Sequence, residues 1–342
     1  MRIAILVLLA CVTAACGADT PAQESLVAVV DTVDGVGRLS YPADPASPLA
    51  WRFDTLAVIG GAMFDDENYQ FQIGTNGLAG NAEGDLFVAD LQGKRILRYD
   101  RSGTFVRSYG REGAGRGELR YPMVVRLGPG DSMWVVDLNN ARITIYDAAD
   151  GGSRRLGPAN TQRQPPSDIA LAGSYLYYVA GSVLASPGTP ADEQPPNPLV
   201  RAALDGTPLD TLWLIEPRPV YALEFRSGST LTVSYTTEMF VTQFRWAPLS
   251  DGRVVVSDSA NYVLHIILPD GTIERTIRRG PPARPVTDED KEAAREEVRA
   301  QSANAPGLVG SPDFVRRWLE KMTFAEVIPR ITNLVVDPKD RI

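Results

Sequence analysis

Short runs of hydrophobic residues that alternate with polar residues recur along most of this chain. Between residues 73 and 109 such runs predict four strands, at 73–80, 86–90, 95–100 and 104–109. Segments rich in Gly and Asp, which favour turns, separate these runs. In the third run Leu97 and Tyr99 fall on one face and Ile96 and Arg98 on the other, as the pleat of a strand requires. The pattern predicts an antiparallel meander of four strands.

This meander is repeated further along the chain. Asp90 and Asp137 occupy equivalent positions 47 residues apart, and so do Arg95 and Arg142. A third, looser copy covers residues 251–271. Repeats of this length that consist of strands and turns are typical of propeller blades. One blade cannot bury both of its faces, so we expect neighbouring blades to stack around an axis.

Six candidate second strands can be placed in the chain. They begin near Leu86, Met133, Tyr175, Thr230, Val254 and Ile342. Six starts predict six blades, although the 24 residues between Thr230 and Val254 are too few for a full blade. Because Ile342 would be the first residue of its strand, the last blade is predicted to be incomplete. Residues 51–59 could supply one outer strand to close the ring.

The first two copies carry a family resemblance. Each has a glycine before a strand that ends in Asp90 or Asp137, followed by Arg95-Ile96 or its equivalent, and a Gly-rich linker at 109–122 joins the copies. Over roughly residues 68–150 this arrangement resembles NHL-type repeats and a bacterial six-bladed β-propeller lipoprotein family, whereas the remaining blades match by pattern only. The resemblance implies an all-β, six-bladed β-propeller of four-stranded antiparallel blades.

The hydrophobic pattern changes from strand-like to helical after residue 280. Thr287 could cap a helix over 288–301, and Ser311 followed by Pro312 is typical of a second helix start. An apolar stripe with helical spacing follows at Phe314, Trp318 and Met322. We therefore expect a helical insertion at 287–323, before the last blade. Its stripe could pack on the propeller, or the insertion could be a lid or a docking element for a partner.

Residues 1–15 have the pattern of a signal peptide. Arg2 precedes an apolar run at 3–12, and small residues lead to Cys16. Ten apolar residues are too few to span a bilayer as a helix. The segment resembles a bacterial lipoprotein signal peptide, which implies cleavage before Cys16 and lipidation of its thiol. Thr13 departs from that pattern, which usually has Leu there, and an ordinary cleaved secretory signal is the alternative.

The remaining chain divides into a tether and the propeller. Residues 16–25 are predicted to be a flexible tether and residues 26–342 to form the β-propeller. Gly17 stands where Asp is associated with retention at the inner membrane. The resemblance therefore implies a lipid-anchored protein of the cell envelope that faces the periplasm, with the outer membrane favoured.

Composition narrows the function classes. The net charge is −8 and no basic cluster offsets it, which argues against a nucleic-acid partner. His265 is the only histidine, so a three-His zinc site is excluded and a Ser-His-Asp triad would have to use it. The amidating lyases that share NHL repeats hold zinc through several histidines, and streptogramin lyases use a catalytic histidine. We expect His265 to be a packed or surface strand residue.

The repeated Asp and Arg residues could bind a metal or substrate near the axis. Because they recur in successive blades, we interpret Asp90 and Asp137 as acceptors for turn N–H groups, with Arg95 and Arg142 bracing the neighbouring strand. The surviving enzyme hypothesis is a calcium-dependent lactonase of the gluconolactonase type, whose oxygen ligands would lie on the axis. Residues that could supply such oxygens are Glu83, Asn139, Asn140, Asp168 and Glu224, although no spacing selects them.

The sequence assigns no catalytic residue, no metal ligand and no cofactor. The Gly-rich linker lacks the Gly-Lys-Ser/Thr ending of a phosphate loop. We predict an exported, lipid-anchored, non-catalytic binding or scaffolding protein, attached to a membrane through Cys16. Its ligand would be a protein, peptide or glycan, bound on the loop-rich faces or in the axial funnel. The lactonase, or another hydrolase of that propeller type, is the alternative.

Overall fold

The computed structural model describes most of the chain beyond the N-terminal region. The described residues are 29–33, 35–41, 55, 57–60, 65–156, 166, 168–181, 193–227, 230–280, 282–303, 311–337 and 339–342. The predicted signal peptide, the tether and Cys16 lie outside them. No helix in the described part combines the length and the apolar character needed to cross a membrane.

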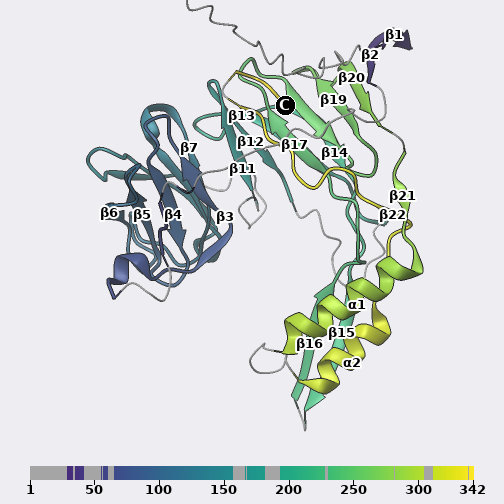
Figure 1. Cartoon of the computed structure of the whole chain (residues 1–342). Coiled ribbons are helices and arrows are strands. Elements are labelled where there is room, and N and C mark those ends of the chain that lie inside the picture. Colours follow the sequence, from purple (N-terminus) through teal and green to yellow (C-terminus); the bar gives the residue numbers. More distant parts are fainter. Residues whose placement is uncertain are drawn as a thin grey trace, which may run out of the picture.

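Four antiparallel four-stranded meanders dominate the described chain (Figure 1). The first contains β3 (Ile73–Gly80), β4 (Leu86–Asp90), β5 (Arg95–Tyr99) and β6 (Phe105–Tyr109). The second contains β7 (Pro122–Leu127), β8 (Met133–Asp137), β9 (Arg142–Tyr146) and β10 (Ser153–Leu156). The third contains β11 (Ile169–Ala172), β12 (Tyr175–Val179), β13 (Asn197–Ala203) and β14 (Pro208–Ile215). The fourth contains β17 (Arg245–Pro248), β18 (Val254–Ser257), β19 (Val263–Ile267) and β20 (Ile273–Arg279).

The first strands of these meanders lie next to one another: β3 beside β7, β7 beside β11, and β11 beside β17. The sheets are therefore blades around a common axis, which confirms the predicted all-β propeller fold. Each interface between blades is filled from both sides. Phe87 and Ile96 of the first blade, for example, share a core with Met133 and Val135 of the second. Stacking thus buries the second face of each blade, as the repeat predicted.

The second strand predicted at Thr230 is wrong as a blade strand. β16 (Thr230–Thr236) pairs along its whole length with β15 (Tyr221–Ser227), and the two form a sheet of their own between the third and fourth blades. The short spacing to Val254 arises because this hairpin is an insertion. Residues 339–342 are not in a strand either, and the described residues form four complete blades. Six blades stay a prediction.

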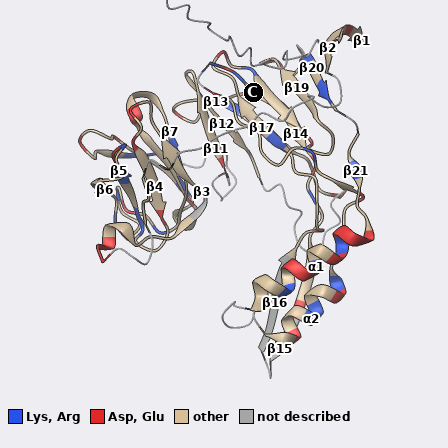
Figure 2. Ribbon diagram, in the orientation of Figure 1, with Lys and Arg blue, Asp and Glu red and all other residues tan. Residues whose placement is uncertain are grey.

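Two helices occupy the segment predicted to be helical, after the fourth blade: α1 (Asp288–Ala303) and α2 (Pro312–Lys321). The hydroxyl of Ser311 caps α2 by accepting a hydrogen bond from the Phe314 N–H at 3.3 Å. Acidic residues fill the first turn of α1, where their negative charges interact favourably with the positive end of the helix dipole (Figure 2). Two short strands, β21 (Arg284–Pro285) before α1 and β22 (Val327–Ile328) after α2, pair antiparallel to each other.

α2 packs on β15 and α1 packs on α2, and we call these helices together with the β15–β16 hairpin the helical lobe. Phe314 is buried against Leu223 of β15 and Trp318. A guanidinium nitrogen of Arg317 donates to the Glu224 carbonyl at 3.4 Å. The apolar stripe of α2 therefore does not pack on the blades, and the lobe projects from the propeller (Figure 1).

The N-terminal strands β1 (Val29–Val33) and β2 (Val36–Tyr41) extend the fourth blade to a six-stranded sheet. β2 runs parallel to β20, with Gly37 opposite Arg275. The outer strand was expected from residues 51–59 instead. Of these, residues 55 and 57–59 are described and are not in a strand, and Ile59 packs against the core of the first blade.

Candidate functional site

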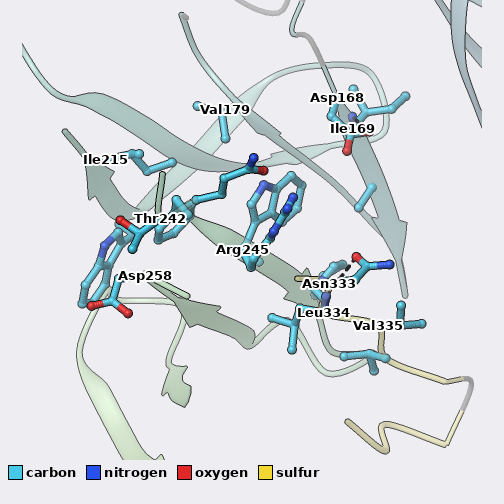
Figure 3. Close-up of a pocket in the computed structure, with 18 of the residues that line it drawn as sticks. Asp168, Ile169, Val179, Ile215, Thr242, Arg245, Asp258, Asn333, Leu334 and Val335 are labelled. Carbon is cyan, nitrogen blue, oxygen red and sulfur yellow. Dashed lines mark hydrogen bonds between the residues drawn. The ribbon is translucent and has the colours of Figure 1, made fainter. Parts of the chain in front are cut away.

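A cavity of about 1220 Å³ lies where the first strands of the four blades converge (Figure 3). Strands β3, β7, β11 and β17 all contribute to its wall. Two further segments also line it: residues 216–219, which follow β14, and residues 333–336. It is therefore the central channel of the propeller, which is where the fold leaves room between its innermost strands.

The cavity wall is mixed: apolar and aromatic side chains line it, and so do the carboxylates of Asp168, Glu216, Glu238 and Asp258. The aromatic side chains are Trp213, Phe244 and Trp246. Leu214 and Val335 also line the cavity, and they are 55% and 66% exposed. Large apolar side chains are usually covered, so a wall of this kind favours a ligand with an apolar part.

Two arginines of the cavity wall form no ion pair with any acidic residue in the described part of the chain. Arg245 is the first residue of β17, and Figure 3 shows it between Asp168 and Ile169 on one side and Ile215 and Thr242 on the other. Its Nε is buried and makes no hydrogen bond within the described part of the chain. Burial lowers the pKa of Arg245.

The second such arginine, Arg218, comes from the segment between β14 and the helical lobe. Burial lowers its pKa, and the positive charge of Arg245 lowers it further. Both guanidiniums belong to the lining of the same cavity. Neither forms an ion pair with a described acidic residue.

A third arginine of the wall, Arg126 on β7, is fully engaged. It forms an ion pair with Asp168 at 2.8 Å, and its Nε donates to the Ile169 carbonyl at 3.1 Å. Burial raises the pKa of Asp168, and the charge of Arg126 opposes that effect. This pair joins the second and third blades and is a structural tie.

The repeated Asp residues are also structural, as interpreted from their recurrence. The Asp90 carboxylate accepts hydrogen bonds from the N–H groups of Gln72 at 3.3 Å and Gln92 at 3.0 Å. Arg95 Nε donates to the same carboxylate at 3.1 Å. The Asp–Arg pair of the first blade is confirmed.

In the second blade Asp137 is an acceptor for backbone N–H groups, as expected, but Arg142 holds the linker and does not contact the carboxylate. Asp137 accepts hydrogen bonds from the N–H groups of Arg120 and Tyr121 and from the side-chain amide of Asn140. Arg142 instead donates to the carbonyls of the Gly-rich linker at Ala114, Gly115 and Glu118. The turn of the second blade places Asn140 against the carboxylate, so Arg142 is left to hold the linker.

The oxygens considered for a calcium site are dispersed. Asp168 lies in the cavity wall, Asn140 donates to Asp137, and Glu224 is in the helical lobe on β15. Glu83 and Asn139 lie in turns that precede β4 and β9. Among the described residues, no group of three or more His, Cys, Asp or Glu side chains is placed to hold a metal ion.

His265 is a packed strand residue of β19. Its Nδ1 lies 3.0 Å from the Thr276 hydroxyl, and its ring stacks on Trp213 with 6.2 Å between the centroids. Burial lowers the His265 pKa, and the charge of Arg278 lowers it further, against the opposing effect of Asp258.

The lowered pKa of His265 predicts a loss of stability in mild acid. The unfolded chain takes up a proton near the ordinary pKa of 6.5, while the folded protein takes it up only at lower pH. The contribution of His265 to stability is thus complete above the unfolded-state pKa of 6.5. It is lost as the pH falls from there towards the lower pKa of the folded state. Urea denaturation between about pH 7.5 and 5 should show a smaller decline for His265→Gln than for the wild type. Equal declines in the two proteins would contradict this assignment.

The sequence did not reveal Arg218 and Arg245. Residues 230–254 were assigned to a short blade, so Arg245 was not recognised as the start of an inner strand. An Arg in an otherwise apolar strand, directly before Trp246, was the available signal. Arg218 lies between prolines and carries no local pattern.

No protein-family model and no curated protein matches the sequence. Among solved structures, a Bacteroides fragilis protein described as exported is similar at 12% identity and a TM-score of 0.41, covering 76% of this chain and 65% of that one. Virginiamycin B lyase from Staphylococcus aureus is similar at 16% identity and a TM-score of 0.32, covering 61% and 57%. A nidogen/laminin complex gives 16% identity and a TM-score of 0.31, covering 59% and 78%.

This chain therefore spans less than two thirds of the length of the first two proteins. Similarity at these TM-scores is too distant to say what the chain binds or catalyses. The assignment to the β-propellers rests on the four blades and their common axis.

Proposed function

We propose that this protein is an exported, lipid-anchored β-propeller that binds a ligand in its axial cavity and has no catalytic role. The observation that carries the proposal is the cavity itself, which combines apolar and aromatic side chains with two arginines that form no ion pair within the described residues. Its volume of about 1220 Å³ is somewhat above the usual range of small-ligand pockets, so it could admit part of a peptide or glycan.

The signal-peptide pattern and the resemblance to NHL-type lipoproteins support a place in the cell envelope. A lipid on Cys16 would hold the propeller at a membrane that faces the periplasm, with the outer membrane favoured. The hydrolase alternative gains no support from the described residues. The one carboxylate among its candidates that reaches the cavity, Asp168, is held by Arg126.

The binding role can be tested by blocking the cavity. Leu214→Trp enlarges a half-exposed side chain of the cavity wall, whereas Leu209→Trp enlarges one of similar exposure on the same strand but outside the cavity. The full chain, expressed in a bacterial envelope and recovered in mild detergent, should carry a bound species in native mass spectrometry. That species should be lost from the Leu214 variant and kept by the Leu209 variant.

Two outcomes would argue against the proposal. A species that remains on the Leu214 variant would not lie in the cavity, and the absence of any species from the wild type would remove the basis for a binding role. In the same strain, Cys16→Ala should release the protein from the membrane fraction, and retention there would contradict lipid anchoring.

A further inference from the structure

We propose that the ligand of the axial cavity carries an anionic group, a carboxylate or a phosphate, which the guanidiniums of Arg218 and Arg245 bind. This inference rests on the proposed binding function and specifies the chemistry of the ligand. The site lies between the third and fourth blades, because Arg218 follows β14 and Arg245 begins β17.

The first argument is the unsatisfied donor on Arg245. Its Nε is buried without a hydrogen-bond partner in the described residues. A buried donor that belongs to a charged group is costly to leave unpaired, so most such groups in folded proteins have an acceptor. An acceptor that enters the cavity would remove that cost.

The second argument is the contrast with other arginines of the blades. Arg126 pairs with Asp168, Arg201 with Asp210, and Arg253 with Asp251 and Glu274. The chain has 42 acidic against 34 basic residues, so acidic partners are abundant. Arg218 and Arg245 form no such pair within the described residues, although the carboxylates of Glu216, Glu238 and Asp258 line the same cavity.

The third argument is electrostatic and concerns the pair itself. Burial lowers the pKa of both arginines, and the charge of Arg245 lowers that of Arg218 further. Two like charges in a partly desolvated cavity oppose folding unless an anion lies between them. Such a pair binds an anion more strongly than exposed arginines would, because water screens it less.

The chemistry of the ligand follows from these groups. A guanidinium presents parallel N–H donors that match the oxygens of a carboxylate or phosphate. Trp213, Phe244 and Trp246 line the same cavity and would contact an apolar or planar part of the ligand. The same anionic group could be carried by a peptide, a glycan or a small molecule.

Binding can be measured with simple probes on the full chain. Phenylacetate and phenyl phosphate carry the two candidate anions on an aromatic ring, and 2-phenylethanol is the neutral counterpart. Trp213 and Trp246 make tryptophan fluorescence a direct readout. We expect both anions, or one of them, to bind the wild type about tenfold or more tightly than 2-phenylethanol. The better anion identifies the group.

Variants of each arginine test its role. Arg245→Gln and Arg218→Gln should each weaken anion binding by about tenfold or more and leave 2-phenylethanol unaffected. Arg155→Gln removes a charge from an exposed position of β10 outside the cavity and should change nothing. Anion binding that is unchanged in both cavity variants would overturn the proposal.

Stability without ligand gives an independent readout. Arg245→Met removes a half-buried charge that has no acidic partner among the described residues, and should raise the melting temperature of the empty protein by about 1–3 °C. Phenylacetate should no longer raise it further. A purely structural Arg245 predicts the opposite, a lower melting temperature, and that result would overturn the proposal.

The outcomes separate this inference from the proposed function. If 2-phenylethanol binds as tightly as the anions and Leu214→Trp abolishes that binding, the cavity binds ligands but the anionic preference is wrong. If none of the probes binds the wild type, the anion inference fails. The binding role is then decided separately by the species that co-purifies with the wild type.

Discussion

Asp137→Ala should lower the free energy of unfolding by about 3 kcal/mol. The side chain is fully buried and accepts hydrogen bonds from the Tyr121 N–H at 2.8 Å and from the Arg120 N–H at 3.2 Å. Alanine would remove the fully buried acceptor that these two backbone donors and the side-chain amide of Asn140 share where the linker enters the second blade. Urea denaturation of the full chain, followed by circular dichroism, measures the change.

Asp100→Ala is the matched control for this prediction. Asp100 also accepts hydrogen bonds from backbone N–H groups, those of Ser102 and Thr104, but it does so in an exposed hairpin loop. Water can replace the lost acceptor there, so the denaturation midpoint should hardly change. Similar losses in the two variants would show that burial of the Asp137 site does not decide its contribution.

Trp134→Ala should lower the free energy of unfolding by about 3–5 kcal/mol. Trp134 is 1% exposed and packs between the second and third blades, where Ile169 and Leu176 belong to the same core. The guanidinium of Arg154 lies 5.4 Å from the centre of its ring. The substitution leaves a cavity at the interface that joins the two blades. Thermal unfolding monitored by calorimetry should show the loss.

The control for Trp134 is Val106→Ala on β6. Val106 is 49% exposed, so few buried contacts are lost and the expected change is within about 0.5 kcal/mol. A loss at Trp134 no larger than that at Val106 would mean that the blades do not depend on this interface for stability.

The blades were predictable because their information is local. In the first two copies each strand is a short alternating run between turn residues, and β4 and β8 begin at the predicted Leu86 and Met133. The helices were predictable for the same reason, since Ser311 and Pro312 mark a start that depends only on neighbouring residues. Fold class, blade architecture and the helical segment all follow from such short-range patterns.

The errors occur where pairing is long-range or depends on context. Strand propensity at 230–236 is the same in a blade and in an inserted hairpin, and only the partner, β15, distinguishes them. The parallel pairing of β2 with β20 joins residues more than two hundred positions apart, so no local signal exists. Asp137 and Arg142 are opposite each other in the ladder, yet Asn140 takes the place of the arginine at the carboxylate.

The cavity residues were missed for a further reason. An arginine is unpaired when no acidic side chain lies beside it in the folded protein. The sequence does not show which side chains become neighbours on folding. Arg245 is one of 34 basic residues, and its position directly before Trp246 does not show whether an acidic side chain lies beside it. Only the positions of the blades show that it faces a cavity.

The attachment of β2 to β20 would also set how the propeller sits over a membrane. If Cys16 carries a lipid, 12 residues lie between the anchor and β1, and a chain of that length reaches at most about 45 Å. The outer edge of the fourth blade would then be the part of the propeller held nearest to the lipid headgroups. The first blade and the projecting lobe would be free to rotate about that edge. The anchor would therefore limit the distance of the propeller from the membrane but not its orientation.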